Sequence, residues 1–152
     1  MRNNKECFPI AAERHYTDSQ YLLQHGRKDN AICHLAFSAE CTLKTFWEAY
    51  HKMNNSFREV KEVHSEEKLN DFLREYYWLT IKNPSFAFLT DLESIPSILF
   101  QDHPERRYYE DQPYTVSVIE QCRRYAETLL KRLVECALDG QITGFCTYKE
   151  NT

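Results

Sequence analysis

The sequence predicts an all-α protein, an up-and-down bundle of about four to five main helices. Turn residues are scarce: only 3 glycines and 5 prolines occur in 152 residues, and a fold of many short strands needs more. Long segments without either residue carry apolar side chains at helical spacing. A hydrophobic share of 42% supplies a core, so we expect one domain over 1–152, with its core at about 9–138 and a tail at 139–152.

The first two helices are predicted from their ends and from one long apolar stripe. Pro9 suits an early helical position and Gly26 a left-handed exit, so the first helix is expected from Pro9 to His25. The second is expected from Asp29, as N-cap, to Met53. A helix that is apolar over so much of its circumference is typical of the centre of a bundle. Its stripe is Ala31, Leu35, Ala39, Leu43, Phe46 and Tyr50.

A third helix is expected from Ser65, a capping residue, to Ile81. Residues 85–100 are apolar but interrupted by Pro96, which favours one or two short helices packed over the bundle. The polar stretch 101–114, with two prolines, is predicted as a loop.

The last helix is expected from Thr115 to Leu138, with Thr115 or Ser117 as its cap. Asp139-Gly140 ends it. Its apolar stripe is Val118, Cys122, Ala126, Leu129, Leu133 and Ala137.

Composition excludes several classes of protein. The net charge of −4 argues against broad electrostatic binding to DNA, although a local basic patch is compatible with it. The N-terminus lacks the apolar segment of a signal peptide, and no run approaches the ~18 apolar residues of a membrane span. The 6 cysteines include no CxxC pair, which disfavours a zinc ribbon. We therefore expect a cytoplasmic protein with reduced, mostly buried thiols and no membrane partner.

Two segments resemble a known family. The first reads Arg14-His15 and Asp18, then Asp29-Asn30-Ala31, then Glu40-Cys41-Thr42-Leu43-Lys44. The second, from Glu105 to Leu133, contains Arg107-Tyr108-Tyr109 ahead of the last helix. In this order the motifs resemble HEPN domains (higher eukaryotes and prokaryotes nucleotide-binding), whose matching loop reads Arg-Tyr-Pro. The resemblance implies a HEPN-like helical bundle that forms homodimers. It also implies the roles of that family: metal-independent RNases, toxins of toxin–antitoxin pairs, and partners of nucleotidyltransferases.

HEPN RNases carry an Arg-x4-6-His motif at the start of the last helix. Arginine stabilises negative charge on the phosphate, and histidine transfers protons. At the matching place this chain has Arg106 and Arg107, but the following window holds Asp111, Gln112 and Pro113 and no histidine. The family's catalytic motif is therefore not intact.

Other arginine and histidine residues are candidates for the same chemistry. The bare spacing recurs at Arg27 and His34 and at Arg58 and His64, outside the last helix. His34 lies on a strongly apolar helix, where a structural histidine is the competing interpretation. The adjacent Arg14 and His15 are expected to face the final helix. The catalytic candidates are thus Arg14, His15, His34 and Arg107.

The loop residues Arg106, Arg107, Tyr108 and Tyr109 are the candidate ligand contacts. Two arginines can hold phosphate and tyrosines can stack on bases. The alternative is a tyrosine that covers the core, beside arginines that are merely solvated. In the family such a tyrosine can also be modified by a partner nucleotidyltransferase.

Other chemistries find no support in the sequence. It contains no P-loop, GxGxxG, nucleophile elbow or HExxH, and the 6 histidines show no metal-ligand spacing, so no metal and no cofactor are expected. The leading hypothesis is a HEPN-like module for nucleotide or RNA binding and regulation in a toxin–antitoxin or defence system. A co-encoded nucleotidyltransferase-type protein is its expected partner. The alternatives are a metal-independent endoribonuclease toxin and a non-catalytic helical interaction module.

Overall fold

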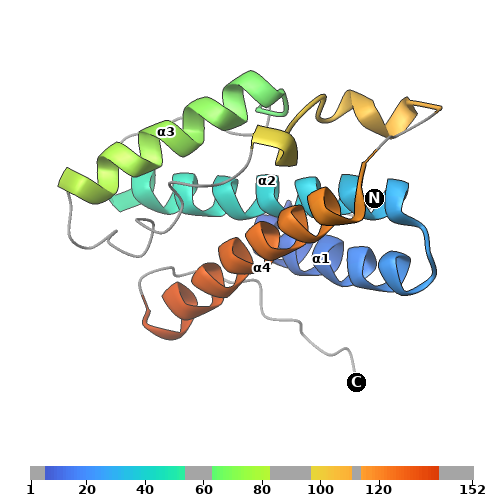
Figure 1. Ribbon diagram of the computed structural model, residues 1–152. Coiled ribbons are helices and arrows are strands. Elements are labelled where there is room, and N and C mark those ends of the chain that lie inside the picture. Colours follow the sequence, from blue (N-terminus) through green and yellow to red (C-terminus); the bar gives the residue numbers. More distant parts are fainter. Residues whose placement is uncertain (1–5, 54–62, 83–96, 111–113, 141–152) are drawn as a thin grey trace, which may run out of the picture.

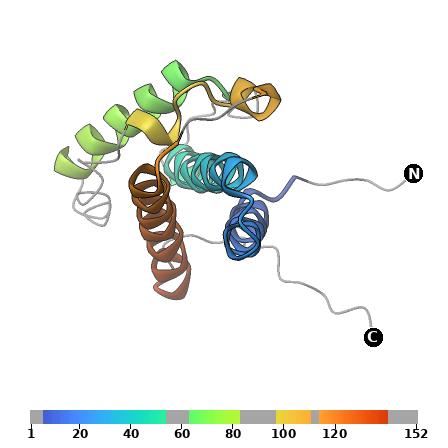
Figure 2. The same ribbon diagram turned by 45° about the vertical axis from the view of Figure 1, so that its right-hand side comes forward.

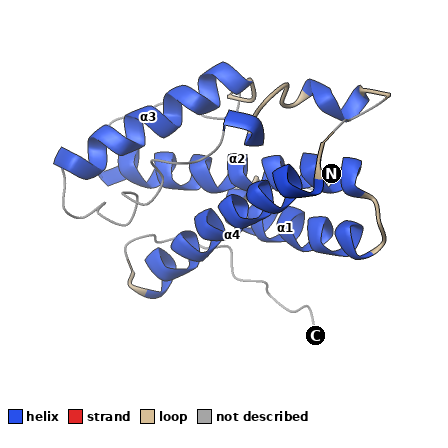
Figure 3. Cartoon of the chain, in the orientation of Figure 1, coloured by secondary structure: helices blue, strands red, loops and turns tan. Residues whose placement is uncertain are grey.

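The computed structural model describes residues 6–53, 63–82, 97–110 and 114–140, and within these ranges every regular element is a helix (Figure 3). The α-helices are α1 (Phe8–Gln24), α2 (Lys28–Met53), α3 (Glu66–Lys82) and α4 (Val116–Leu138). Two short 3-10 helices, η2 (Ser97–Leu99) and η3 (Glu105–Tyr108), precede α4. The predicted all-α bundle is therefore confirmed, with four main helices in the described part of the chain.

Helix α2 lies at the centre of the molecule (Figure 1). Helices α1 and α4 pack on one side of it, and α3 and the segment 97–110 lie on the other, as the turned view also shows (Figure 2). The apolar stripe explains this position, because α2 buries side chains around most of its circumference. Its completely buried residues include Ala31, Ile32, Leu35, Ala36, Ala39, Leu43 and Phe46.

Helices α1 and α2 form a tight hairpin. Gly26 adopts a φ of 71°, the left-handed conformation that glycine reaches without strain. Its N–H donates to the carbonyl of Leu23 at 3.1 Å, and the N–H of Arg27 donates to Leu22 at 2.8 Å, which closes the end of α1. Helix α2 begins at Lys28, so Asp29 lies in its first turn and is not the N-cap that was predicted.

The caps of α3 and α4 are those expected from the sequence. The hydroxyl of Ser65 accepts a hydrogen bond from the N–H of Lys68 at 3.4 Å. That of Thr115 accepts from the N–H of Val118 at 3.3 Å. Each hydroxyl satisfies a backbone donor that has no partner inside its helix.

The predicted loop 101–114 contains the helical turn η3, so it is more ordered than its composition indicated. Before it, Leu99 and Phe100 are completely buried. The predicted helical stretch 85–96, the tail 141–152 and Arg58 lie outside the described residues. The described helices include none that is long and apolar enough to cross a membrane.

Candidate functional site

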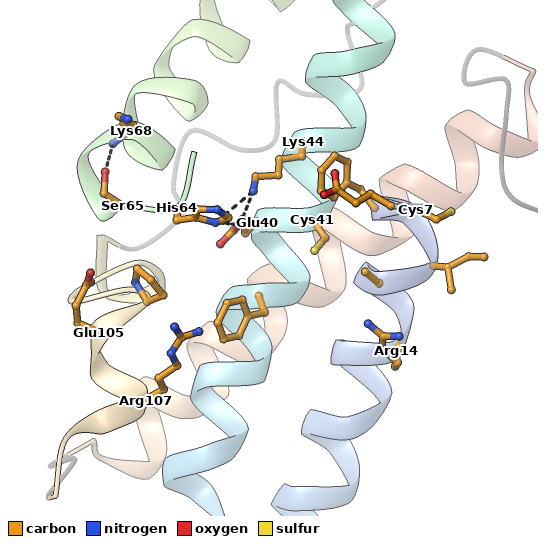
Figure 4. A pocket seen from close by; sticks show the side chains of 16 residues that line it. Cys7, Arg14, Glu40, Cys41, Lys44, His64, Ser65, Lys68, Glu105 and Arg107 are labelled. Atoms are coloured by element: carbon orange, nitrogen blue, oxygen red, sulfur yellow. Dashed lines mark hydrogen bonds and ion pairs between the residues drawn. The ribbon is translucent and has the colours of Figure 1, made fainter. Parts of the chain in front are cut away.

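A pocket of about 1260 Å³ opens between four segments of the chain. It is lined by the first two turns of α1, the middle of α2, the start of α3 and η3. In Figure 4 Arg14 and Arg107 extend from segments on the two sides of α2, and Glu40, Lys44 and His64 point toward one another. The pocket therefore joins residues that are far apart in sequence.

Beside this pocket lies a polar group that we call the buried cluster: Glu40, Lys44, His64 and His103. The first three line the pocket; Glu40, Lys44 and His103 are buried, and the side chain of His64 is half exposed. Glu40 Oε1 accepts hydrogen bonds from Lys44 Nζ at 2.6 Å and from His64 Nδ1 at 2.8 Å. Glu40 Oε2 accepts from His103 Nε2 at 2.7 Å. Lys44 and Glu40 are 1% and 3% exposed. Three donors to one carboxylate are what a buried charge needs to be tolerated in a protein interior.

The pKa shifts in the buried cluster follow from these contacts. Burial by itself would raise the pKa of Glu40, but the hydrogen bond from His103 and the charge of Lys44 outweigh burial, so this pKa lies below its ordinary value. Burial lowers the pKa of His103, and the hydrogen bond to Glu40 only partly opposes this. At neutral pH the cluster therefore holds an ionised carboxylate and a neutral His103. The N–H of each imidazole donates, because an ionised carboxylate only accepts.

Two anchors place His103 against α2. The guanidinium of Arg106 donates to the carbonyl of Ile98 at 3.2 Å and to that of Leu99, tying η3 to η2. The N–H of Asp102 donates to Glu66 Oε2 at 2.9 Å, tying the same segment to α3. The segment between η2 and η3 is thus held on both sides of His103.

Three cations border the pocket outside the buried cluster: Arg14, Lys68 and Arg107. None of them forms an ion pair with any residue that the structure describes. Glu40 and Lys44 cancel each other, and Glu6 and Glu105 are the remaining acids of the lining. The local charge is therefore positive in a chain whose net charge is −4.

The structure separates the two arginines of the predicted ligand loop. Arg106 is completely buried and bonded to backbone carbonyls, so it has a structural role in place of the ligand contact expected from the sequence. Arg107 is exposed, and its guanidinium lies 5.7 Å from the ring centre of Phe37 and 4.7 Å from that of Tyr108. Tyr108 and Tyr109 are 75% and 48% exposed. Three of the four loop residues are thus accessible to a ligand.

The catalytic candidates fall into two places. Arg14 and Arg107 border the pocket. His15 was expected to face the final helix, but it packs on α2 instead, with its Nδ1 3.1 Å from Nδ1 of His34 and its ring stacked on Phe37. Asp18 Oδ2 lies 3.9 Å from the same nitrogen of His34. We call His15, Asp18 and His34 the hairpin cluster.

The hairpin cluster is more open than the buried one. His15 and His34 are half-buried and Asp18 is exposed. Burial first, and then the neighbouring His34 and Arg14, lower the pKa of His15 to about 4. His15 is therefore neutral at neutral pH, with a nitrogen lone pair on its ring.

Sequence reasoning missed the buried cluster. Glu40 and Lys44 stand four residues apart, a spacing typical of an ion pair on an exposed helix face, yet both are buried. A signal was present, because Glu40 lies four residues after Ala36 and three before Leu43, on the apolar face of the helix. His103 gave no comparable signal, since nothing in a polar segment indicates which histidine will reach the core.

Burial makes the thiols of Cys41 and Cys122 poor nucleophiles. Cys41 lines the pocket, but burial and the charge of Glu40 raise its pKa to about 12. Burial likewise raises the pKa of Cys122 to about 11. The thiolate is the reactive form, so these cysteines act as small apolar residues. None of the five described cysteines forms a disulfide, and Cys146 lies outside the described residues.

Comparison with protein-family models, with curated proteins and with solved structures found no match. The fold and the geometry of the pocket therefore carry the functional argument.

Proposed function

We propose that this chain binds a phosphate-bearing ligand, a nucleotide or a single-stranded RNA, in the pocket between α1, α2, α3 and η3. The observation that carries the proposal is the convergence of Arg14, Lys68 and Arg107 on one pocket without ion-pair partners among the described residues. Arginine matches the geometry of phosphate oxygens, and these cations have no ion pair among the described residues to break when an anion binds.

The size and the lining of the pocket support the same class of ligand. About 1260 Å³ is more than a small metabolite needs. Phe8 and Phe37 line the pocket, and Tyr108 lies beside Arg107. Aromatic rings next to arginines suit unpaired bases, which stack on them with little sequence preference.

The resemblance to HEPN domains points in this direction, since that family is named for nucleotide binding. A toxin–antitoxin or defence setting and a co-encoded nucleotidyltransferase-type partner rest on the resemblance alone. The homodimer also stays a prediction, and light scattering of the purified protein would measure it.

Binding is tested by fluorescence anisotropy with a labelled single-stranded RNA, and with ATP as competitor. We expect the double variant Arg14→Ala/Arg107→Ala to bind at least about tenfold more weakly, the loss of two charge-assisted phosphate contacts. Arg124→Ala is the matched control, because Arg124 is exposed on α4 and does not line the pocket. Absence of binding by the unaltered protein, or equal affinity of the double variant, would refute the proposal.

A second candidate function is metal-independent RNA cleavage, which one observation favours. His64 lines the same pocket as Arg14 and Arg107, and its Nδ1 donates to Glu40. In the neutral form that leaves Nε2 as a proton acceptor, oriented by a buried carboxylate. The sequence had assigned this role to His15 or His34, which lie in the hairpin cluster instead.

Cleavage is tested by incubating structured RNA with the protein in EDTA. The enzyme hypothesis requires cleavage that His64→Ala and Arg107→Ala abolish and His25→Ala retains. If the RNA stays intact, the cleavage hypothesis is refuted. The binding proposal is unaffected by that result, because binding is measured separately.

A further inference from the structure

We propose that the hairpin cluster is a site for a divalent transition-metal ion, Zn²⁺ fitting its ligands best. The site would consist of His15 Nδ1, His34 Nδ1 and a carboxylate oxygen of Asp18, all within 4.8 Å of one another. It is separate from the pocket that the proposed function concerns, since none of the three residues lines that pocket.

The separations of the ligand atoms are near those around a bound zinc ion. Zinc–nitrogen and zinc–oxygen bonds of about 2.0–2.2 Å in a tetrahedron place neighbouring ligand atoms about 3.3–3.5 Å apart. The two imidazole nitrogens are 3.1 Å apart, and the nearer Asp18 oxygen is 3.9 Å from that of His34. The ligand atoms of His15 and Asp18 lie within 4.8 Å of each other, so binding requires the side chains to rotate inward.

The scaffold places these ligands without help from a loop. His15 and Asp18 are three residues apart on α1 and therefore lie on one face of that helix. His34 comes from α2, the other arm of the hairpin. The ring of His15 is also stacked on Phe37, with centroids 5.4 Å apart. Ligands on packed helices keep their geometry better than ligands on loops.

A simple hydrogen bond between the two histidines is the competing explanation. One shared proton would satisfy both Nδ1 atoms, but it would give the nearby carboxylate no role. A cation satisfies both nitrogens and the carboxylate together. Two imidazoles and one carboxylate form a ligand set found in zinc and other first-row metal sites, with a position left for water. The partial exposure of His34 and Asp18, 33% and 51% of their side chains, gives an ion a path from solvent.

The experiment uses untagged full-length protein stripped with EDTA. Zn²⁺ is titrated by calorimetry, and Co²⁺ by its visible absorption, which reports the geometry and the ligand type. We expect one ion per chain, a Co²⁺ spectrum without the charge-transfer band of a thiolate ligand, and a rise in Tm with Zn²⁺, because an ion that binds only the folded state stabilises it.

The variants decide which residues bind. We expect His15→Ala and His34→Ala to weaken Zn²⁺ affinity by about tenfold or more. Asp18→Asn should weaken it as well, and this exposed position keeps the test valid if a histidine variant unfolds. His25→Ala is the matched control, because His25 is an exposed histidine at the C-terminal end of α1, away from the cluster. No binding by the unaltered protein, a thiolate spectrum, or undiminished affinity in Asp18→Asn and the His15→Ala/His34→Ala pair would overturn the site.

Discussion

The buried cluster and the hairpin cluster lie along the same helix and contain similar groups, yet they are organised in opposite ways. Each combines two histidines with one carboxylate, and each contacts Phe37: His15 stacks on its ring and His103 meets it edge-on at 4.6 Å. In the buried cluster one carboxylate receives three donors and its charge is matched by Lys44. In the hairpin cluster two imidazole nitrogens and a carboxylate converge, and Asp18 forms no ion pair with a lysine or arginine of the described residues.

From this difference we assign a structural role to the buried cluster and a binding role to the hairpin cluster. A network centred on a buried carboxylate with three donors fixes the positions of the elements that it joins, and here it joins α2 to the start of α3 and to the segment before η3. A half-exposed group of acceptors adds little to the fold and is free to receive an ion. We therefore expect substitutions in the two clusters to have very different effects on stability.

The largest expected effect comes from a matched pair of isosteric changes. Glu40→Gln removes the buried negative charge to which Lys44, His64 and His103 donate, so the free energy of unfolding should fall by about 3–5 kcal/mol. Asp18→Asn alters an exposed carboxylate and should change it by less than about 0.5 kcal/mol. Urea denaturation followed by circular dichroism measures both. Similar losses in the two variants would contradict the distinction between the clusters.

A second pair tests the anchor of the buried cluster. Arg106→Met removes the guanidinium from the carbonyls of Ile98 and Leu99 and should cost about 1–3 kcal/mol. The neighbouring Arg107→Met changes an exposed side chain and should cost less than about 0.5 kcal/mol. The same denaturation experiment serves here. A greater loss for Arg107→Met would mean that the two arginines have been assigned the wrong roles.

The pH dependence of stability reports on one histidine from each cluster. The fold lowers the pKa of His15, to about 4, and that of His103, from an unfolded value of 6.5. Protonation then favours the unfolded chain, so stability falls as the pH drops below 6.5. Each histidine contributes up to about 1.4 kcal/mol per pH unit. The lowered pKa of Glu40 extends the loss below pH 4.5 in the same direction, because its stabilisation disappears as the carboxyl is protonated.

Urea titrations at several pH values, in EDTA, measure this slope. His103→Gln should reduce the pH dependence of the free energy of unfolding by the equivalent of up to one bound proton. The contribution of His15 should remain. A stability that does not change between about pH 6 and pH 5 would show that neither histidine is held neutral.

The smallest expected change in stability comes from the N-terminus of α4, which lies outside both clusters and serves as a reference. Thr115→Ala removes the N-cap of α4 and should cost about 1 kcal/mol. Ser117→Ala, the other capping candidate from the sequence, lies exposed within the helix and should be nearly neutral. Thermal unfolding followed by circular dichroism compares them. Equal costs would mean that Thr115 does not cap the helix.

The sequence predicts the helices well because local rules determine them. Apolar spacing located α2 and α4, Gly26 and Gly140 marked two helix ends, and Ser65 and Thr115 marked two caps. Some predictions were wrong. Asp29 has good capping chemistry, but the tight turn after Gly26 starts α2 at Lys28, so that Asp29 lies inside the helix.

The candidate site was predictable only in part. Arg14, Arg107 and the two loop tyrosines stood out as cations and aromatic rings in a polar setting. Whether Arg106 or Arg107 faces solvent depends on the η3 turn, which local sequence does not determine. The contact of His15 with His34 depends on how α1 packs against α2, because no spacing along the chain relates residues of two helices.

The salt dependence of RNA binding tests the central claim most directly. Each phosphate contact on a single strand contributes about 0.7 to the slope of log Kd against log salt concentration. If Arg107 contacts a phosphate in the pocket, Arg107→Ala should lower that slope by about this amount, and Arg124→Ala should leave it unchanged. Identical slopes for the unaltered protein and Arg107→Ala, or an equal decrease in Arg124→Ala, would contradict a phosphate site in this pocket.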